Sequence, residues 1–173
     1  VGTPSRRDAE APAAAVAAGE GRAAGASVGG PMLGGCIVVG PSTKILVPFF
    51  KLGLIPDCGM MRTLPLRVDI CRARRIIFES QAIKGEEAVS IGLADILADD
   101  AQVMDTAIAK ASELARMPRG ALTLVKERLR TPPANFEEDL TREERDQVQL
   151  LRGEDFKEGF AAFTEKRAAD FTR

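Results

Sequence analysis

Apolar residues stand side by side at positions 37–39 and again at 45–47, and both runs contain β-branched side chains. A strand that is covered on both faces has such an unbroken apolar run, whereas a strand with one face in water alternates with polar residues. The sequence therefore predicts buried strands over 37–39 and 44–47. A further strand is expected over 93–97, directly after the glycine that would end a short helix over 86–91.

The remainder of the chain has the periodicity of helices. Apolar residues recur every three or four positions over 66–78 and 101–117, and further helices are expected over 121–129 and 135–152. Pro118 closes one of these segments, and Asn135 is a good N-cap for the last. The helix over 66–78 is expected to expose its arginines and to bury Val68, Ile70, Cys71, Ile76 and Ile77.

An aromatic stripe marks the end of the chain. Phe156, Phe160 and Phe163 fall at i, i+4 and i+7, which places them on one face of a helix. A stripe of this kind is more often a core or an interface than a ligand site. The helix before it has only a thin apolar stripe, so we expect that helix to lie on a surface or a subunit face.

Residues 1–20 are rich in alanine and are interrupted by prolines and acids. They lack the apolar core of a signal peptide, and their acids argue against a transit peptide despite Arg6 and Arg7. We expect a disordered or weakly helical tail over 1–20, an α/β core over 21–100 and a helical region over 101–173. The predicted fold class is α/β.

Composition narrows the possible functions. The 173 residues suit one domain, and a net charge of −1 attracts neither nucleic acid nor an anionic membrane, so neither is an expected partner. The chain has no histidine, which removes Ser-His and Cys-His triads and leaves proton transfer to Asp, Glu or Lys. Its three cysteines match no metal spacing, so we expect reduced thiols, a cytoplasmic location and no metal site.

The candidate chemistry lies in the sequence Lys-Leu-Gly-Leu-Ile-Pro-Asp-Cys-Gly at residues 51–59. Pro56 biases the residue before it away from the helical region, so Asp57 is placed to start a helix. Asp57 is also the only acid between residues 21 and 68. Two interpretations stay open. The carboxylate either caps a helix at the surface, or lies in an apolar pocket that makes it a better base.

Further segments accompany residues 51–59: Pro-Ser-Thr-Lys at 41–44, Leu-Pro at 64–65, Glu-Glu-Ala-Val-Ser-Ile-Gly-Leu-Ala-Asp at 86–95, and the stretch from 155 to 167. Together they resemble the enoyl-CoA hydratase/isomerase (crotonase) family, and in particular its 1,2-epoxyphenylacetyl-CoA isomerase branch. The resemblance covers roughly residues 20 to 173, and several motifs in the right order are more specific than any single one.

The resemblance implies a fold and a reaction. The fold would be a partial ββα spiral followed by a helical C-terminal region, and the reaction would be isomerisation of an acyl-CoA thioester. Such an isomerase moves a proton between the α and γ carbons with one carboxylate, while two backbone N–H groups stabilise the charge on the thioester oxygen. By this resemblance Asp57 is the base, and Ala26, with Gly25 beside it, donates one of the N–H groups.

The resemblance also implies binding residues and partners. Phe49, Leu54 and Gly59 would contact the substrate near the base, and Phe163 and Lys166 would reach the CoA of a neighbouring subunit. Phe49 and Leu54, with Cys58 and Met60, would form the apolar pocket around the carboxylate. The expected partners are an acyl-CoA thioester and further copies of the chain, as a homotrimer or homohexamer. Coenzyme A enters as part of the substrate, with no separate cofactor.

Some features depart from the family pattern. Pro31 interrupts an expected helix at a cost of about 3 kcal/mol, and Cys36 replaces the usual Asp. The glycine-rich segment, residues 21–40, could therefore instead be a packed turn. The positions that match the two hydratase acids are Gly30 and Phe49, which cannot transfer protons. Family members also carry about 100 more residues before the glycine-rich turn. The alternative is therefore a non-catalytic crotonase-like module that has kept oligomerisation or binding.

Overall fold

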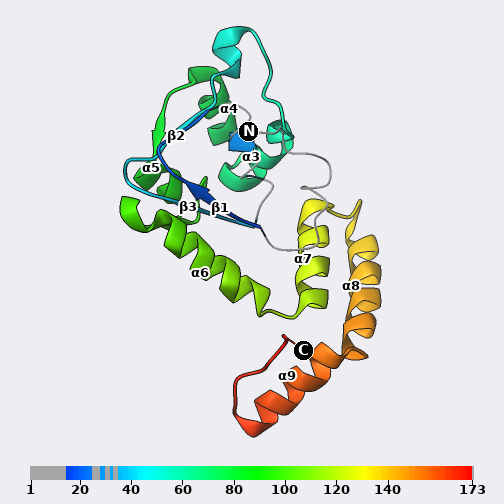
Figure 1. Ribbon diagram of the computed structural model, residues 1–173. Helices are drawn as coiled ribbons and strands as arrows, with labels where there is room; N and C mark the ends of the chain where they lie inside the picture. The colour runs from blue at the N-terminus through cyan, green and yellow to red at the C-terminus, as the bar shows by residue number, and fades with distance from the viewer. Residues whose placement is uncertain (1–14, 25–27, 30–31, 33–34, 173) are drawn as a thin grey trace. The chain divides into compact units, whose positions relative to one another are not determined.

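The computed structural model describes residues 15–24, 28–29, 32 and 35–172 (Figure 1). They form two compact units, one that extends to Ala111 and one that begins at Ser112. We call them the spiral unit and the helical unit, and each is described by itself. The boundary falls inside helix α6 (Val103–Ala115), so residues 101–111, which we expected in the helical region, belong to the spiral unit.

The spiral unit contains two three-stranded sheets. The first sheet consists, in spatial order, of β1 (Val16–Gly19), β3 (Cys36–Val39) and β6 (Ile96–Leu97), all parallel. The second consists of β2 (Arg22–Ala24), β4 (Lys44–Leu46) and β5 (Ile83–Lys84), with β4 parallel to β2 and antiparallel to β5. The predicted strands over 37–39 and 44–47 are thereby confirmed, and the strand expected over 93–97 is shorter.

Strands β1 to β4 alternate between the two sheets, which makes this part of the chain spiral. β1 leads into β2 and β3 leads into β4, while β3 lies parallel beside β1 and β4 parallel beside β2. Thr43 joins the connection between β3 and β4 to the end of β1, because its hydroxyl donates a hydrogen bond to the carbonyl of Gly19 at 2.6 Å. The structure therefore confirms an α/β fold with a partial ββα spiral.

Both faces of β3 are covered, as its unbroken apolar sequence predicts. Ile37 and Val39 belong to the main core, whereas Cys36 and Val38 belong to a second core that Val103 of α6 completes. Alternate residues of a strand point to opposite faces, so one strand supplies both cores.

Residues 16–19 correct the prediction of a disordered tail over 1–20. They form β1 and pair with β3 along its whole length, Val16 opposite Cys36 and Gly19 opposite Val39. The sequence Val-Ala-Ala-Gly has little strand propensity of its own, so the neighbouring strand decides its conformation. Residues 1–14 lie outside the part of the chain that the structure describes.

Three helices cover the main core: α3 (Met60–Val68), α4 (Ile70–Glu79) and α5 (Gly85–Ser90). The single helix expected over 66–78 is wrong, because Asp69 breaks it with φ 70° and ψ 163°. The carboxylate of Asp69 accepts a hydrogen bond from the amide of Arg72 at 2.9 Å and so caps α4. Three of the five residues expected inside this segment are buried, Val68, Ile76 and Ile77, whereas Ile70 and Cys71 are exposed.

Two short 3-10 helices, η1 (Phe49–Leu52) and η2 (Asp100–Gln102), complete the spiral unit. The helical unit consists of the end of α6 followed by α7 (Arg119–Arg130), α8 (Phe136–Leu151) and α9 (Glu154–Glu165). As expected, Asn135 is the N-cap of α8, and its side chain accepts a hydrogen bond from the amide of Glu138 at 2.9 Å. Among its described residues, the helical unit buries only Asp146 and Ala162.

Candidate active site

Asp57 lies at a sharp corner between η1 and α3. The chain leaves the buried Pro56, passes Asp57, and then takes two left-handed residues, Cys58 (φ 50°) and Gly59 (φ 74°). The amide of Met60 donates a hydrogen bond to the carbonyl of Asp57 at 2.9 Å. Helix α3 begins only after this turn, with Gly59 as its N-cap and no side-chain cap, so the prediction that Asp57 caps the helix is wrong.

The corner packs against the glycine-rich segment at Gly29. A Cβ on residue 29 would lie 2.6 Å from the Cβ of Cys58 and 3.4 Å from its carbonyl oxygen, so only glycine allows this approach. Val28 and Gly29 are buried and helical. The predicted oxyanion residues Gly25 and Ala26 lie outside the described residues, as does Gly30.

The surroundings of Asp57 differ from the apolar pocket that we expected. Phe49 and Met60 are buried, at 8% and 0% exposure, but they belong to the main core. Leu54 is 56% exposed, and Asp57 and Gly59 are exposed as well. Gly53 ends η1 in a left-handed conformation (φ 72°), and residues 50–55 on both sides of it are exposed. The carboxylate is therefore directly accessible to a ligand from solvent.

Cys58 is the residue whose chemistry is most altered at this corner. Burial raises the pKa of its thiol, and the Asp57 carboxylate raises that pKa further, both as acceptor of the thiol's hydrogen bond and through its negative charge. The raised pKa favours the protonated form of this thiol. Cys58 was expected only as part of the apolar pocket, and its close approach to Gly29 depends on the left-handed turn.

Asp95 is a second residue whose role was not evident from the sequence. Its carboxylate accepts a hydrogen bond from the amide of Ile37 at 2.7 Å and pairs with Arg67 at 3.1 Å. These contacts tie the C-terminal end of α3 to the start of β3. Asp95 thus helps to fix the helix that follows the Asp57 corner.

The remaining predicted contacts, Phe163 and Lys166, belong to the helical unit. Phe163 is 82% exposed, and Lys166 follows α9 in a left-handed conformation with φ 56°. The structure brings Asp57, Cys58, Gly59 and Gly29 together in the spiral unit, whereas these two residues lie on a separate unit.

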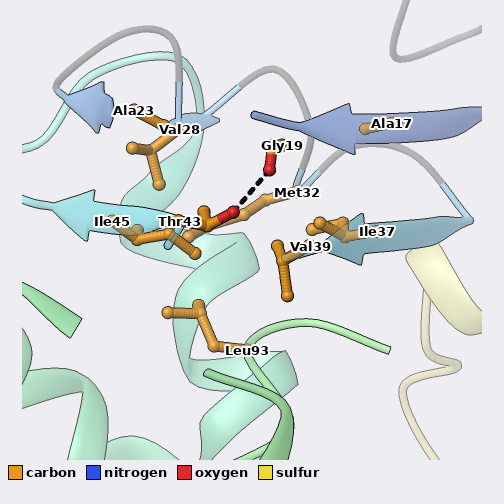
Figure 2. A pocket seen from close by; sticks show the side chains of 10 residues that line it. All are labelled: Ala17, Gly19, Ala23, Val28, Met32, Ile37, Val39, Thr43, Ile45 and Leu93. Carbon is orange, nitrogen blue, oxygen red and sulfur yellow. Dashed lines mark hydrogen bonds between the residues drawn. The ribbon is translucent and has the colours of Figure 1, made fainter. Parts of the chain in front are cut away.

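A small cavity of about 30 Å³ lies inside the spiral unit. Figure 2 shows its lining, which comes from both sheets and includes small residues such as Ala17, Gly19 and Ala23. The one hydroxyl drawn there, that of Thr43, is already bonded to the Gly19 carbonyl. The lining residues carry no ionisable group, so this cavity is part of the core and offers no acid or base.

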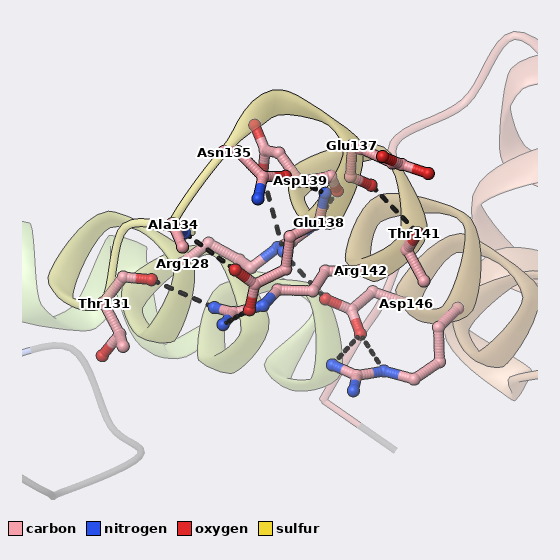
Figure 3. A network of polar contacts seen from close by, with 11 residues as sticks. Arg128, Thr131, Ala134, Asn135, Glu137, Glu138, Asp139, Thr141, Arg142 and Asp146 are labelled. Carbon is pink, nitrogen blue, oxygen red and sulfur yellow. Dashed lines mark hydrogen bonds and ion pairs between the residues drawn. The ribbon is translucent and has the colours of Figure 1, made fainter.

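A polar network joins α7 and α8 in the helical unit (Figure 3). Arg128 of α7 donates to the carbonyl of Asp139 at 3.2 Å and pairs with the buried Asp146 at 3.3 Å. Arg145 holds the other oxygen of Asp146 at 2.9 Å. Arg128 Nη1 pairs with Asp139 at 3.6 Å, and Asp146 Oδ2 pairs with Arg128 Nε at 3.3 Å. Both atoms are buried, and these ion pairs lack hydrogen-bond geometry. Both residues are held by charges inside the unit, which identifies the network as structural.

The described part of the chain has neither a metal centre nor a membrane-spanning helix. His, Cys, Asp and Glu residues nowhere gather there in a group of three that could hold a metal ion. None of the described helices combines the length and the apolarity needed to cross a membrane. Cys36, Cys58 and Cys71, all in the described part of the chain, form no disulfide, with Cys36 buried and Cys71 exposed.

Comparisons with known proteins agree with the sequence motifs. Residues 7–173 match the family described as enoyl-CoA hydratase/isomerase. The chain is 34% identical to 1,2-epoxyphenylacetyl-CoA isomerase of Escherichia coli over 168 residues, which is 96% of this chain and 64% of that protein. It is 28% identical to 2,3-dehydroadipyl-CoA hydratase of the same organism, over 90% of this chain and 62% of that one.

The fold is shared with solved structures as well. The chain is similar to an enoyl-CoA hydratase subunit I of Geobacillus kaustophilus, with a TM-score of 0.86, 26% identity, and coverage of 96% of this chain and 66% of that one. This chain therefore spans about two thirds of the length of the proteins it matches. By sequence and by fold, it belongs to the enoyl-CoA hydratase/isomerase (crotonase) family.

Proposed function

We propose that this chain acts on an acyl-CoA thioester and isomerises it by proton transfer, with Asp57 as the base. The observation that carries this proposal is the accessible carboxylate of Asp57 at a corner packed against Gly29. Asp57 is the only acid between residues 21 and 68. Support also comes from the similarity to a protein named as an isomerase of a CoA thioester.

In the proposed reaction the Asp57 carboxylate takes a proton from the α carbon of a 3-enoyl-CoA. The electron pair shifts the double bond into conjugation, the thioester oxygen carries the negative charge, and the proton returns at the γ carbon. One carboxylate is enough, because it acts first as base and then as acid. Gly25 and Ala26 are proposed to provide one N–H group to that oxygen, and losing such a donor typically costs about 10²–10³ in rate.

Substrate binding is proposed to extend beyond the base. Phe49, Leu54 and Gly59 would contact the acyl part, since they flank Asp57 in the chain. Phe163 and Lys166 would contact the CoA of a neighbouring copy. Coenzyme A is part of the substrate in this scheme, and no separate cofactor takes part.

Self-association through the helical unit forms part of the proposal. Phe156, Phe160 and Phe163 are 44%, 63% and 82% exposed on one side of α9. With Phe171 and Pro118 they line an apolar hollow of about 430 Å³. Burying such a surface against other copies is favourable, which supports a homotrimer or homohexamer.

The direct test is replacement of Asp57 by Asn, which keeps the size of the side chain but cannot accept the proton. Conversion of a 3-enoyl-CoA to its conjugated isomer should fall by about 10²-fold or more. Asp105→Asn is the matched control, because Asp105 is an exposed acid on α6. A rate for Asp57→Asn equal to that of the control would show that Asp57 is not the base.

A second candidate is a non-catalytic crotonase-like module. It is favoured by the exposure of Asp57, which leaves the carboxylate without the expected apolar pocket. A chain that neither isomerises nor binds any acyl-CoA in calorimetric titration, yet associates with itself, would support this alternative. Tight binding of an acyl-CoA together with turnover would exclude it.

A further inference from the structure

The chain turns back beside α9 after that helix ends (Figure 1). The turn begins at Lys166, which is left-handed with φ 56°. It is closed by the amide of Arg167, which donates a hydrogen bond to the carbonyl of Ala162 at 3.0 Å. We call residues 166–172 the strap, and both the strap and α9 belong to the helical unit.

One carboxylate, that of Glu158 on α9, holds the strap. Its two oxygens accept hydrogen bonds from the Arg167 guanidinium, Oε1 from Nη1 at 2.5 Å and Oε2 from Nη2 at 3.2 Å. Oε1 also accepts a hydrogen bond from the amide of Asp170 at 2.9 Å. The Glu158 side chain is only 12% exposed. A carboxylate that binds an arginine through both oxygens fixes the geometry of the contact as well as its strength, so Glu158 clamps the strap at two points.

The strap brings an aromatic ring onto Gly159. A Cβ on residue 159 would lie 3.7 Å from Cζ of Phe171, so the ring packs directly against the glycine. Gly159 is three residues after Phe156 and four before Phe163, which places it on the same face of α9 as the aromatic stripe. Phe171 is half-buried and lines the apolar hollow together with the stripe. Its ring therefore fills the gap that the glycine leaves in the stripe.

We propose that the strap completes the surface through which copies of this chain associate, and that the Glu158 clamp holds it ready for that contact. This inference rests on the self-association put forward with the proposed function, and it names the segment that completes the surface. Among the residues that line the hollow, Asp155 is the only ionisable one. An aromatic surface with so little charge packs against apolar surface of a second copy at small electrostatic cost, and a net charge of −1 per chain adds little repulsion.

The clamp strengthens association without touching the second copy. A strap that is already held in place loses little conformational entropy when another copy binds. A loose strap would have to be ordered at that moment, and until then the gap at Gly159 would stay open. Glu158 is thus expected to affect affinity through the order of the strap.

Hydrogen exchange tests the clamp in the full chain, at a protein concentration too low for association. Glu158→Ala removes the acceptor and keeps a strong helix former in α9. The amides of residues 166–172, followed by mass spectrometry of the C-terminal peptide, should exchange about tenfold faster or more in this variant. Glu154→Ala is the control, because Glu154 is 86% exposed and pairs with Lys157 within α9. Equal exchange in the two variants would show that Glu158 does not hold the strap.

Self-association tests the role of the strap. Phe171→Ser removes the ring and leaves the clamp, whereas Glu158→Ala removes the clamp and leaves the ring. Each should weaken association by about tenfold in light scattering over a range of concentrations, while Glu154→Ala should associate as the parent chain does. Unchanged association in both variants would overturn the proposal. Tighter association of Glu158→Ala would overturn it as well, since the strap would then cover the surface rather than complete it.

The outcomes separate this inference from the proposed function. A parent chain that associates, with the strap variants associating equally well, refutes the role of the strap and leaves self-association in place. A parent chain that is a monomer at every concentration refutes self-association and the role of the strap together. Neither result bears on proton transfer by Asp57, which the isomerisation assay tests on its own.

Discussion

The spiral unit and the helical unit are stabilised in different ways. Among the residues that the structure describes, every buried hydrophobic side chain except that of Ala162 lies in the spiral unit. The helical unit instead joins its helices through charged contacts, such as Arg128 with Asp146, and exposes the phenylalanines of α9. The first unit has a core of its own, whereas the second has apolar surface still to cover, so the two should respond differently to mutation.

The largest difference is expected for the removal of a leucine. Leu64 is 0% exposed in the spiral unit, so Leu64→Ala should lower the free energy of unfolding by about 2–5 kcal/mol through lost burial and a cavity. Leu129 of the helical unit is 74% exposed, and Leu129→Ala should change it by less than about 0.5 kcal/mol. Urea unfolding in dilute solution measures both. Equal losses would contradict the contrast between the units.

Association should depend on the aromatic stripe of the helical unit. Replacing Phe156, Phe160 and Phe163 together by Ser should weaken self-association by about 100-fold, because association would then remove less apolar surface from water. Light scattering at tens of micromolar protein gives the mass of the assembly. Leu66→Ser, which changes a 63% exposed residue of the spiral unit, serves as control. A parent chain that is already a clean monomer would rule out this use of the stripe.

The charged network of α7 and α8 should contribute less to the free energy of unfolding than the core of the spiral unit, but more than an ion pair at the surface. Asp146 is 7% exposed, so Arg128→Ala leaves a buried carboxylate with only Arg145 and should cost about 2 kcal/mol. Arg145→Ala is the control, because the Arg145 side chain is 69% exposed, and it should cost under about 1 kcal/mol. Thermal unfolding compares the two. Similar losses would mean that the burial of Asp146 has no energetic consequence.

The smallest expected effect is on the stability of the helical unit at acidic pH. The amide of Ala134, at 2.8 Å, and the Arg142 guanidinium stabilise the Glu138 carboxylate and lower its pKa below the ordinary value of 4.5. A lowered pKa in the folded state gives stability that is present above pH 4.5 and is lost as the pH falls through the folded-state value. Glu138→Gln should therefore flatten the acid side of a plot of melting temperature against pH. An unchanged slope would show that the contacts of Glu138 with Ala134 and Arg142 do not contribute to stability.

Much of the fold could be predicted from local pattern. The unbroken apolar run at 37–39 fixes a strand that feeds two cores, and Asn135 starts α8 where a capping residue is expected. Tertiary context decided the rest. Val16–Gly19 becomes a strand only because β3 lies beside it, and Asp69 breaks a helix whose apolar periodicity continues across it.

The candidate site could be predicted in part. A single acid in a long stretch drew attention to Asp57, and this residue does lie against the glycine-rich segment at Gly29. The sequence left open whether its carboxylate lies at the surface or in an apolar pocket, and the structure has it at the surface. The close approach of Cys58 to Gly29 could not be foreseen, since it depends on a backbone angle that its sequence does not favour.

The central claim is that Asp57 transfers a proton of the substrate, and hydrogen exchange tests it most directly. A 3-enoyl-CoA is incubated in D₂O with the full chain, and deuterium in the recovered thioester is located by NMR. Because Asp57 is exposed, the proton that it takes exchanges with D₂O before it is returned. The account therefore predicts deuterium at the α and γ carbons with the parent chain and with Asp105→Asn, and none above the uncatalysed level with Asp57→Asn. Equal incorporation with Asp57→Asn, or none with the parent chain, would contradict it.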